Sequence, residues 1–173
     1  MTYLADPAQP LWQQIPADEF ALIKSLLNRV PVPIGEVAAA LSIDVVSLTL
    51  PVEISGLIKK ISPDIEGYQI QVNNTDAAVR QRFTVAHEIA HYFLHKSYID
   101  SDGITDSILY RSKLSDKKEA EANRLAAAML LPWNEVQAWH HERYGCAPKA
   151  EFLDEIAKAF RVSSLAVGFR FGF

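Results

Sequence analysis

The segment from Arg82 to His95 constrains the fold more than any other part of the chain. At about 100° per residue, a helix through this segment is apolar around most of its circumference, so it must be buried. The remaining stripe of that helix is polar, and it carries Arg80, Thr84, His87, Glu88, His91 and His95. Buried imidazoles and carboxylates are costly unless they are paired. A stripe of this kind therefore needs a partner, and a bound divalent cation supplies one.

Within this helix the sequence has the pattern H-E-x-x-H. His87 and His91 are four residues apart, about 40° around the axis, so both can bind one cation from the same face. Glu88 lies next to that cation, where a general base would act. The spacing predicts a zinc site of the metallopeptidase type, in which three protein ligands leave a fourth position open.

The third ligand is expected from a later helix, over residues 116–131. Glu119 and Glu121 lie about 200° apart on this helix, so only one of them can face the site. Glu119 shares its side with small and apolar residues: Ala122, Ala126 and Leu130. Glu121 shares its side with Lys117 and Arg124. We therefore predict that Glu119 is the ligand and that Glu121 points to solvent. Asn123, one turn on, either holds a ligand or is a helix-packing amide.

The remaining pattern predicts an α+β fold that is mostly helical, with a small antiparallel or mixed β-sheet. Residues 1–16 are expected to be an irregular lead-in, and 96–115 a long connection. The other helices are expected at 18–28, capped by Asp18, and at 34–41, 76–95, 133–143 and, as a pair, 149–173. Extended segments are expected at 42–50, 54–61 and 68–72.

Length and composition indicate one domain over residues 1–173, with a core of about 18–135 and a C-terminal helical hairpin at 147–173. The only cysteine, Cys146, excludes an internal disulfide and favours a reducing, cytoplasmic location. The net charge of −4 argues against nucleic-acid or membrane binding by the whole surface. No signal peptide and no apolar run of about 20 residues is found.

Two motifs together resemble the ImmA/IrrE family of metallopeptidases. The first runs from Arg80 to His91 and continues into Leu94-His95; the second runs from Glu119 to Ala127 and continues into Leu130-Leu131-Pro132. The resemblance implies a thermolysin-like zincin core with His87, His91 and Glu119 as zinc ligands and Glu88 as the catalytic residue. It also implies a bacterial protein that cleaves an Xre-type helix-turn-helix repressor, often encoded nearby, and so relieves repression. Many relatives have phenylalanine where Leu125 stands, which is a mild packing change.

Several roles stay open at the level of sequence. The oxyanion of the reaction needs a stabilising group, and the candidates are His95, Tyr110, Tyr92 and Arg111. His95 is otherwise expected to contact a ligand or the substrate, or to be structural. A peptide substrate could add to the strand at 54–61 or to the strand at 68–72 by backbone hydrogen bonds.

Two alternative functions remain. The first is DNA binding, because the hairpin at 147–173 has the spacing of a helix-turn-helix pair. Its basic residues are offset by Glu151, Asp154 and Glu155, however, and this charge balance disfavours binding to the phosphates of DNA. The other alternative is a catalytically silent zinc-binding module that sequesters a repressor or a toxin–antitoxin component.

Overall fold

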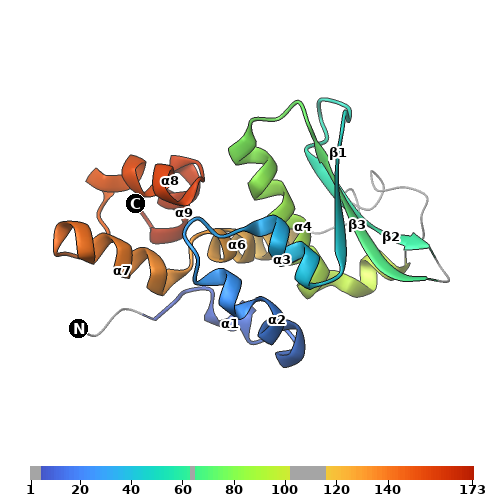
Figure 1. Cartoon of the computed structure of the whole chain (residues 1–173), viewed down its shortest axis with the longest axis horizontal. Coiled ribbons are helices and arrows are strands. Elements are labelled where there is room, and N and C mark those ends of the chain that lie inside the picture. The colour runs from blue at the N-terminus through green and yellow to red at the C-terminus, as the bar shows by residue number, and fades with distance from the viewer. Residues whose placement is uncertain (1–4, 63–64, 102–115) are drawn as a thin grey trace.

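The computed structural model describes residues 5–62, 65–101 and 116–173 (Figure 1). Its elements, in chain order, are α1 (Gln9–Trp12), α2 (Ala17–Leu27), α3 (Ile34–Ala40), β1 (Ile43–Leu48), β2 (Gly56–Ser62), β3 (Ile65–Asn73), α4 (Ala78–Ser101), α6 (Asp116–Leu130), α7 (Trp133–Tyr144), the 3-10 helix η2 (Ala150–Phe152), α8 (Leu153–Phe160) and α9 (Ser164–Phe171). The fold is thus mostly helical with one small sheet, which confirms the predicted α+β class.

The sheet is mixed, and its strand order is β1-β3-β2. β1 pairs with β3 in parallel, with Ile43 opposite Tyr68, and β2 pairs with β3 antiparallel, with Gly56 opposite Val72. The central strand is β3, so the segment at 68–72 cannot accept a further strand. Of the two segments that we considered for substrate binding, only β2 lies at an edge.

Helix α4 packs between the sheet and α6, and this three-layer contact forms the core (Figure 1). Ile70 of the sheet, Ala86, Ile89 and Ala90 of α4, and Leu125 of α6 are all fully buried. The alanines allow the helices to approach closely. This is the burial that the apolar circumference of the helix predicted.

The N-terminal region is more regular than expected. The predicted irregular lead-in contains the short helix α1. Just before this helix, the side chain of Asp6 accepts a hydrogen bond from the backbone N–H of Ala8 at 2.8 Å. The predicted cap of the next helix is wrong, because Pro16 takes the N-cap position of α2 and Asp18 lies in its first turn. Proline suits a helix start because it lacks the N–H that would be unpaired there.

Helix α4 extends beyond the predicted end at residue 95 and reaches Ser101. The backbone departs from helical geometry at one residue, His95, with φ −134° and ψ 24°. Beyond this kink Ile99 is buried, and Asp100 accepts a hydrogen bond from the Tyr68 hydroxyl at 2.6 Å. Burial of Ile99 and the bond of Asp100 to the sheet favour a helix over residues 96–101, which we expected to belong to a loop.

The C-terminal helices are held to the rest of the fold by two arginines, of which Arg170 is buried and Arg82 partly exposed. The Arg170 guanidinium lies 2.7 Å from Asp6 Oδ1, and its Nε donates to the carbonyl of Leu131 at 3.2 Å. Arg82 of α4 donates to the carbonyls of Val32 and Arg161, at 2.9 and 3.2 Å. These bonds set the position of α9 relative to α4. The division into a core at 18–135 and a hairpin at 147–173 stays a prediction.

His140 on α7 is fully buried. Its Nδ1 lies 2.9 Å from the Cys146 carbonyl, and its ring packs against Tyr144 and Phe152. The chain turns at Gly145, which adopts a left-handed conformation, and η2 then folds back over the imidazole. Across the described ranges, none of the helices combines the length and apolarity that a bilayer span requires.

We predict that Gly56→Ala destabilises the fold, because a Cβ there would collide with Thr84 Cγ2 and lie 2.6 Å from the backbone oxygen of Gln71. Overpacking of this kind costs about 1–3 kcal/mol. The matched control is Gly35→Ala in α3, where nothing lies within 4 Å. That control should be neutral or gain up to about 1 kcal/mol from helix propensity. Urea unfolding of both variants measures the difference, and equal midpoints would contradict the close β2–α4 packing.

Candidate metal centre

His87 and His91 project from the same side of α4, and their Nε2 atoms are 2.9 Å apart. Glu119 of α6 faces both rings: one carboxylate oxygen lies 3.4 Å from His87 Nε2 and the other 3.4 Å from His91 Nε2. His91 is almost fully buried, whereas the His87 and Glu119 side chains are partly exposed. The two helices thus bring two imidazoles and one carboxylate to a single point.

The spacing of these atoms fits a divalent cation. A tetrahedral metal with bonds of about 2.0–2.1 Å places its ligand atoms roughly 3.3 Å apart. The two imidazole nitrogens are 2.9 Å apart, and each of them lies 3.4 Å from a different oxygen of the Glu119 carboxylate. Among the described residues, His87, His91 and Glu119 form a group that could hold a metal ion. Two nitrogens and one carboxylate are also a donor set that zinc accepts.

The electrostatics of Glu119 agree with this assignment. Its pKa is held well below the usual range, first by the hydrogen bond with His87 and then by that with His91, against the opposing effect of burial. The carboxylate is therefore charged, as a metal ligand must be. Burial of Ala122 and Ala126 on the same side of α6 directs Glu119 toward α4.

Glu88 follows His87 on α4 and is only 1% exposed. A carboxylate buried to this degree is costly for a helix that serves only to pack, because the charge must leave water. Its place one residue after the first imidazole sets it beside the cluster rather than within it. The sequence predicted this arrangement from helix geometry alone.

His95 lies behind His91 and continues the polar stripe inward. The Nδ1 atoms of the two rings are 3.0 Å apart, and His95 Nε2 is 3.5 Å from Glu121 Oε2. Burial, followed by the neighbouring His91, lowers the pKa of His95, which favours a neutral ring. The predicted orientation of Glu121 toward solvent is therefore wrong. The helical wheel describes α6 alone, whereas the packing of α6 against α4 places His95 within reach of this side chain.

Of the other predicted site residues, some lie near the cluster and others do not. Asn123 lines a pocket together with His87. Tyr92 points away from the cluster: its hydroxyl donates to Glu19 Oε1 at 2.9 Å, and its ring packs against Tyr68. The structure therefore does not bring Tyr92 to the site. Tyr110 and Arg111 lie outside the described residues.

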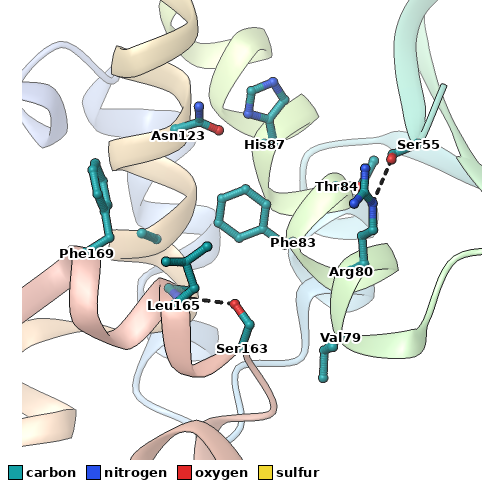
Figure 2. Close-up of a pocket in the computed structure, with 12 residues that line it drawn as sticks. Ser55, Val79, Arg80, Phe83, Thr84, His87, Asn123, Ser163, Leu165 and Phe169 are labelled. Atoms are coloured by element: carbon teal, nitrogen blue, oxygen red, sulfur yellow. Dashed lines mark hydrogen bonds between the residues drawn. The ribbon is translucent and has the colours of Figure 1, made fainter. Parts of the chain in front are cut away.

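A pocket of about 630 Å³ opens beside His87 (Figure 2). Its walls come from the first turns of α4, from α6, from α9 and from the residue before β2. The residues on it include Val79, Phe83, His87, Asn123, Leu165 and Phe169. The Phe83 ring stacks on His87, with centroids 6.5 Å apart. This pocket was not predicted from the sequence, although Phe83, the apolar residue one turn before His87, was a signal for it.

Two buried or partly buried imidazoles that face a carboxylate on a second helix form a site that could hold a metal ion. The sequence also matches the family Peptidase M78, described as the IrrE N-terminal-like domain, over residues 38–171. The chain belongs to this family, which confirms its resemblance to the ImmA/IrrE metallopeptidases and implies metalloprotease activity.

Other comparisons are less specific. No curated protein matches the chain in sequence. Among solved structures, it is similar to a Mycobacterium tuberculosis transcriptional regulator, with 17% identity and a TM-score of 0.48. That match covers 97% of this chain and 47% of the regulator, so the chain spans about half the length of that protein.

We predict that the purified protein holds about one divalent metal ion per chain and that Glu119→Ala loses it, because only two imidazoles then remain. Elemental analysis by mass spectrometry, after dialysis against a weak chelator, measures the metal content. Glu135→Ala, which removes a glutamate from α7, serves as the control and should keep the metal. A Glu119→Ala protein that retains a full equivalent would contradict the assignment of this ligand.

Proposed function

We propose that this protein is a zinc-dependent endopeptidase with a thermolysin-like core. In this proposal His87, His91 and Glu119 bind zinc, and Glu88 is the catalytic base. The observation that carries it is the meeting of two helices at a point where the three ligand atoms have the spacing of a metal site, with a buried carboxylate adjacent in sequence.

When bound, zinc supplies a Lewis acid that polarises the scissile carbonyl and makes water more acidic. Glu88 accepts a proton from the attacking water as the C–O bond forms, and passes it to the amine as the C–N bond breaks. Because Glu88 is buried, little bulk water competes with the attacking water for hydrogen bonds to its carboxylate, and the electrostatic attraction between the two is stronger. Asn123, which lines the pocket with His87, stays a candidate for contact with a ligand or with the developing oxyanion. His95 lies behind His91 and stays a candidate for contact with a ligand, and Tyr110 stays a candidate from the sequence.

Glu121 and His95 are proposed to orient His91. If His91 Nε2 binds the metal, its Nδ1 carries the proton and donates it to His95 Nδ1 across 3.0 Å. His95 then has its own proton on Nε2, directed at the Glu121 carboxylate 3.5 Å away. This chain of contacts, from carboxylate to imidazole to ligand, selects one tautomer of His91, as partners behind metal-binding histidines commonly do.

We expect Glu121→Ala to weaken zinc binding by about tenfold to a hundredfold. His95→Ala should cost a similar amount, and the double variant little more, because both residues act through one chain of contacts. Competition with a chromogenic chelator measures the affinity, and thermal unfolding of the metal-free proteins tests for a purely structural effect. Lys117→Ala, which removes an exposed partner of Glu121 at 3.9 Å, is the matched control. Wild-type affinity in Glu121→Ala would contradict the role of this carboxylate.

The proposed substrate is a protein, specifically an Xre-type helix-turn-helix repressor in the bacterial cytoplasm. Support for a polypeptide comes from β2, which ends the strand order and packs on α4 so closely that a Cβ at Gly56 would collide with Thr84. An extended segment could add to this edge by backbone hydrogen bonds close to the metal ligands. The repressor itself rests on the family resemblance, and relief of repression after its cleavage is part of the same proposal.

Direct nucleic-acid binding through the C-terminal hairpin is disfavoured. Arg170, one of the basic residues available to it, is buried against Asp6, and Lys149 lies 3.7 Å from Glu151. The exposed face of α9 carries Leu165 and Phe169, which offer phosphates no charge. A helix that reads DNA would present basic and polar side chains on this face.

Co-expression with the helix-turn-helix protein encoded nearby tests the function. We expect that protein to be cut, and Glu88→Gln to reduce the rate by about a hundredfold to ten-thousandfold while metal content and complex formation persist. Electrophoresis and mass spectrometry identify the products, and pull-down measures the complex. Binding of the partner by the wild-type protein without any cut would instead support the silent, sequestering module.

A further inference from the structure

We infer that the pocket beside His87 receives a large apolar side chain of the substrate, immediately next to the bond that is cut. α9 of the C-terminal hairpin forms one wall of this pocket and so sets specificity. This inference rests on the proposed function, because it assigns a substrate preference to the same site.

The first argument is position. His87, a proposed metal ligand, and Asn123 lie at one end of the pocket, and Val79 and Ser163 lie at the other (Figure 2). A polypeptide whose scissile carbonyl is at the metal therefore has a neighbouring side chain at the mouth of this pocket. Phe83 stacks on His87 and continues the wall away from the ligand, so the two regions are contiguous.

The second argument is the exposure of apolar groups. Leu165 is 83% exposed and Phe169 is 62% exposed, and both extend from α9 into the pocket region (Figure 2). Val79 of α4, 40% exposed, adds a third apolar group. Large apolar groups that gather on one concave surface usually mark a binding site. An apolar side chain of the substrate would cover them.

The third argument is that the wall is already in place. Ser163 caps α9 by accepting a hydrogen bond from the backbone N–H of Ala166 at 3.2 Å. Arg82 binds the carbonyl of Arg161 in the turn before α9, and Arg170 at its other end is buried with Asp6. The start of α9 is thus fixed to α4, and its end is fixed to the N-terminal region. Little ordering is needed on binding, which favours affinity.

The volume of the pocket sets the class of occupant. A space of about 630 Å³ accommodates a phenylalanine, leucine or methionine side chain together with its backbone. Among the described residues that line the pocket, Arg80 is the one lysine, arginine, aspartate or glutamate; it donates to Ser55 Oγ at 2.9 Å and lies 3.3 Å from Asp76. Its charge is partly satisfied by these partners, so an acidic side chain gains little from entering. The pocket therefore selects for apolar size.

The test uses the zinc-loaded protein and two small probes that share one metal-binding group, N-acetylglycine hydroxamate and N-acetylphenylalanine hydroxamate. Isothermal titration calorimetry measures both affinities, so no substrate needs to be known and no activity is required. We expect the phenylalanine compound to bind about tenfold or more tightly than the glycine compound, because its ring is buried in the pocket.

Substitutions in α9 test whether this helix causes the tighter binding of the phenylalanine compound. Leu165→Ala and Phe169→Ala should each reduce the preference by about threefold or more, and Ala166→Trp, which fills the pocket, should abolish it. The glycine compound should bind all of these proteins equally. Leu22→Ala is the matched control, since it removes a leucine that is 55% exposed on α2, away from the pocket. Leu165 and Phe169 are exposed, so their replacement should leave the thermal unfolding midpoint unchanged.

The outcomes separate the two proposals. If both compounds bind the wild-type protein equally, or if the α9 variants behave like Leu22→Ala, the specificity pocket is wrong while the metal site stands. If neither compound binds the zinc-loaded protein, the proposed zinc peptidase fails, and the pocket assignment fails with it. A clear preference that is reduced or lost in the α9 variants, and kept in Leu22→Ala, supports both.

Discussion

The packing of α4 against α6 is the contact on which the site depends. Within one helix, geometry places His87 and His91 on a common face, but it provides only two ligands. The third comes from 28 or more residues further along the chain and reaches both imidazoles at 3.4 Å only because α6 lies against α4. The small side chains of Ala86, Ala90, Ala122 and Ala126 are buried at no cost in rotamer entropy and allow this approach. The stability of the fold and the proposed metal site therefore depend on one interface.

The same helix satisfies two opposed requirements. Its apolar circumference is buried against the sheet and α6, while its polar stripe carries Glu88, His91 and His95 into the interior. Buried polar groups must be paired, and two polar side chains of α4 outside the ligand set have partners on other elements. His95 lies against Glu121, and Tyr92, on the other side of the helix, is bonded to Glu19. Removal of one partner thus affects the metal ligands through the next.

The C-terminal hairpin shows how a common helical pattern can be used in an unexpected way. Its spacing resembles a helix-turn-helix pair, yet Arg170 is directed into the protein, and Leu165 and Phe169 face outward beside the metal centre. Spacing alone describes where two helices begin and end. The role of the hairpin depends on which face of α9 remains accessible, and the contacts of Arg82 and Arg170 determine that face.

Sequence by itself determined the features that depend on local geometry: the α+β class, most helix positions, the common face of His87 and His91, and the inward side of α6 that carries Glu119. These follow from a repeat of about 3.6 residues per turn and from burial of apolar groups. Only the tertiary structure decided that Glu121 meets His95, that His140 is enclosed, that β3 is central and β2 lies at the edge, and that α9 borders the site. The reason is physical: a helical wheel orders side chains around one axis, whereas these contacts depend on how separate elements cross, which is set by packing between residues distant in the chain.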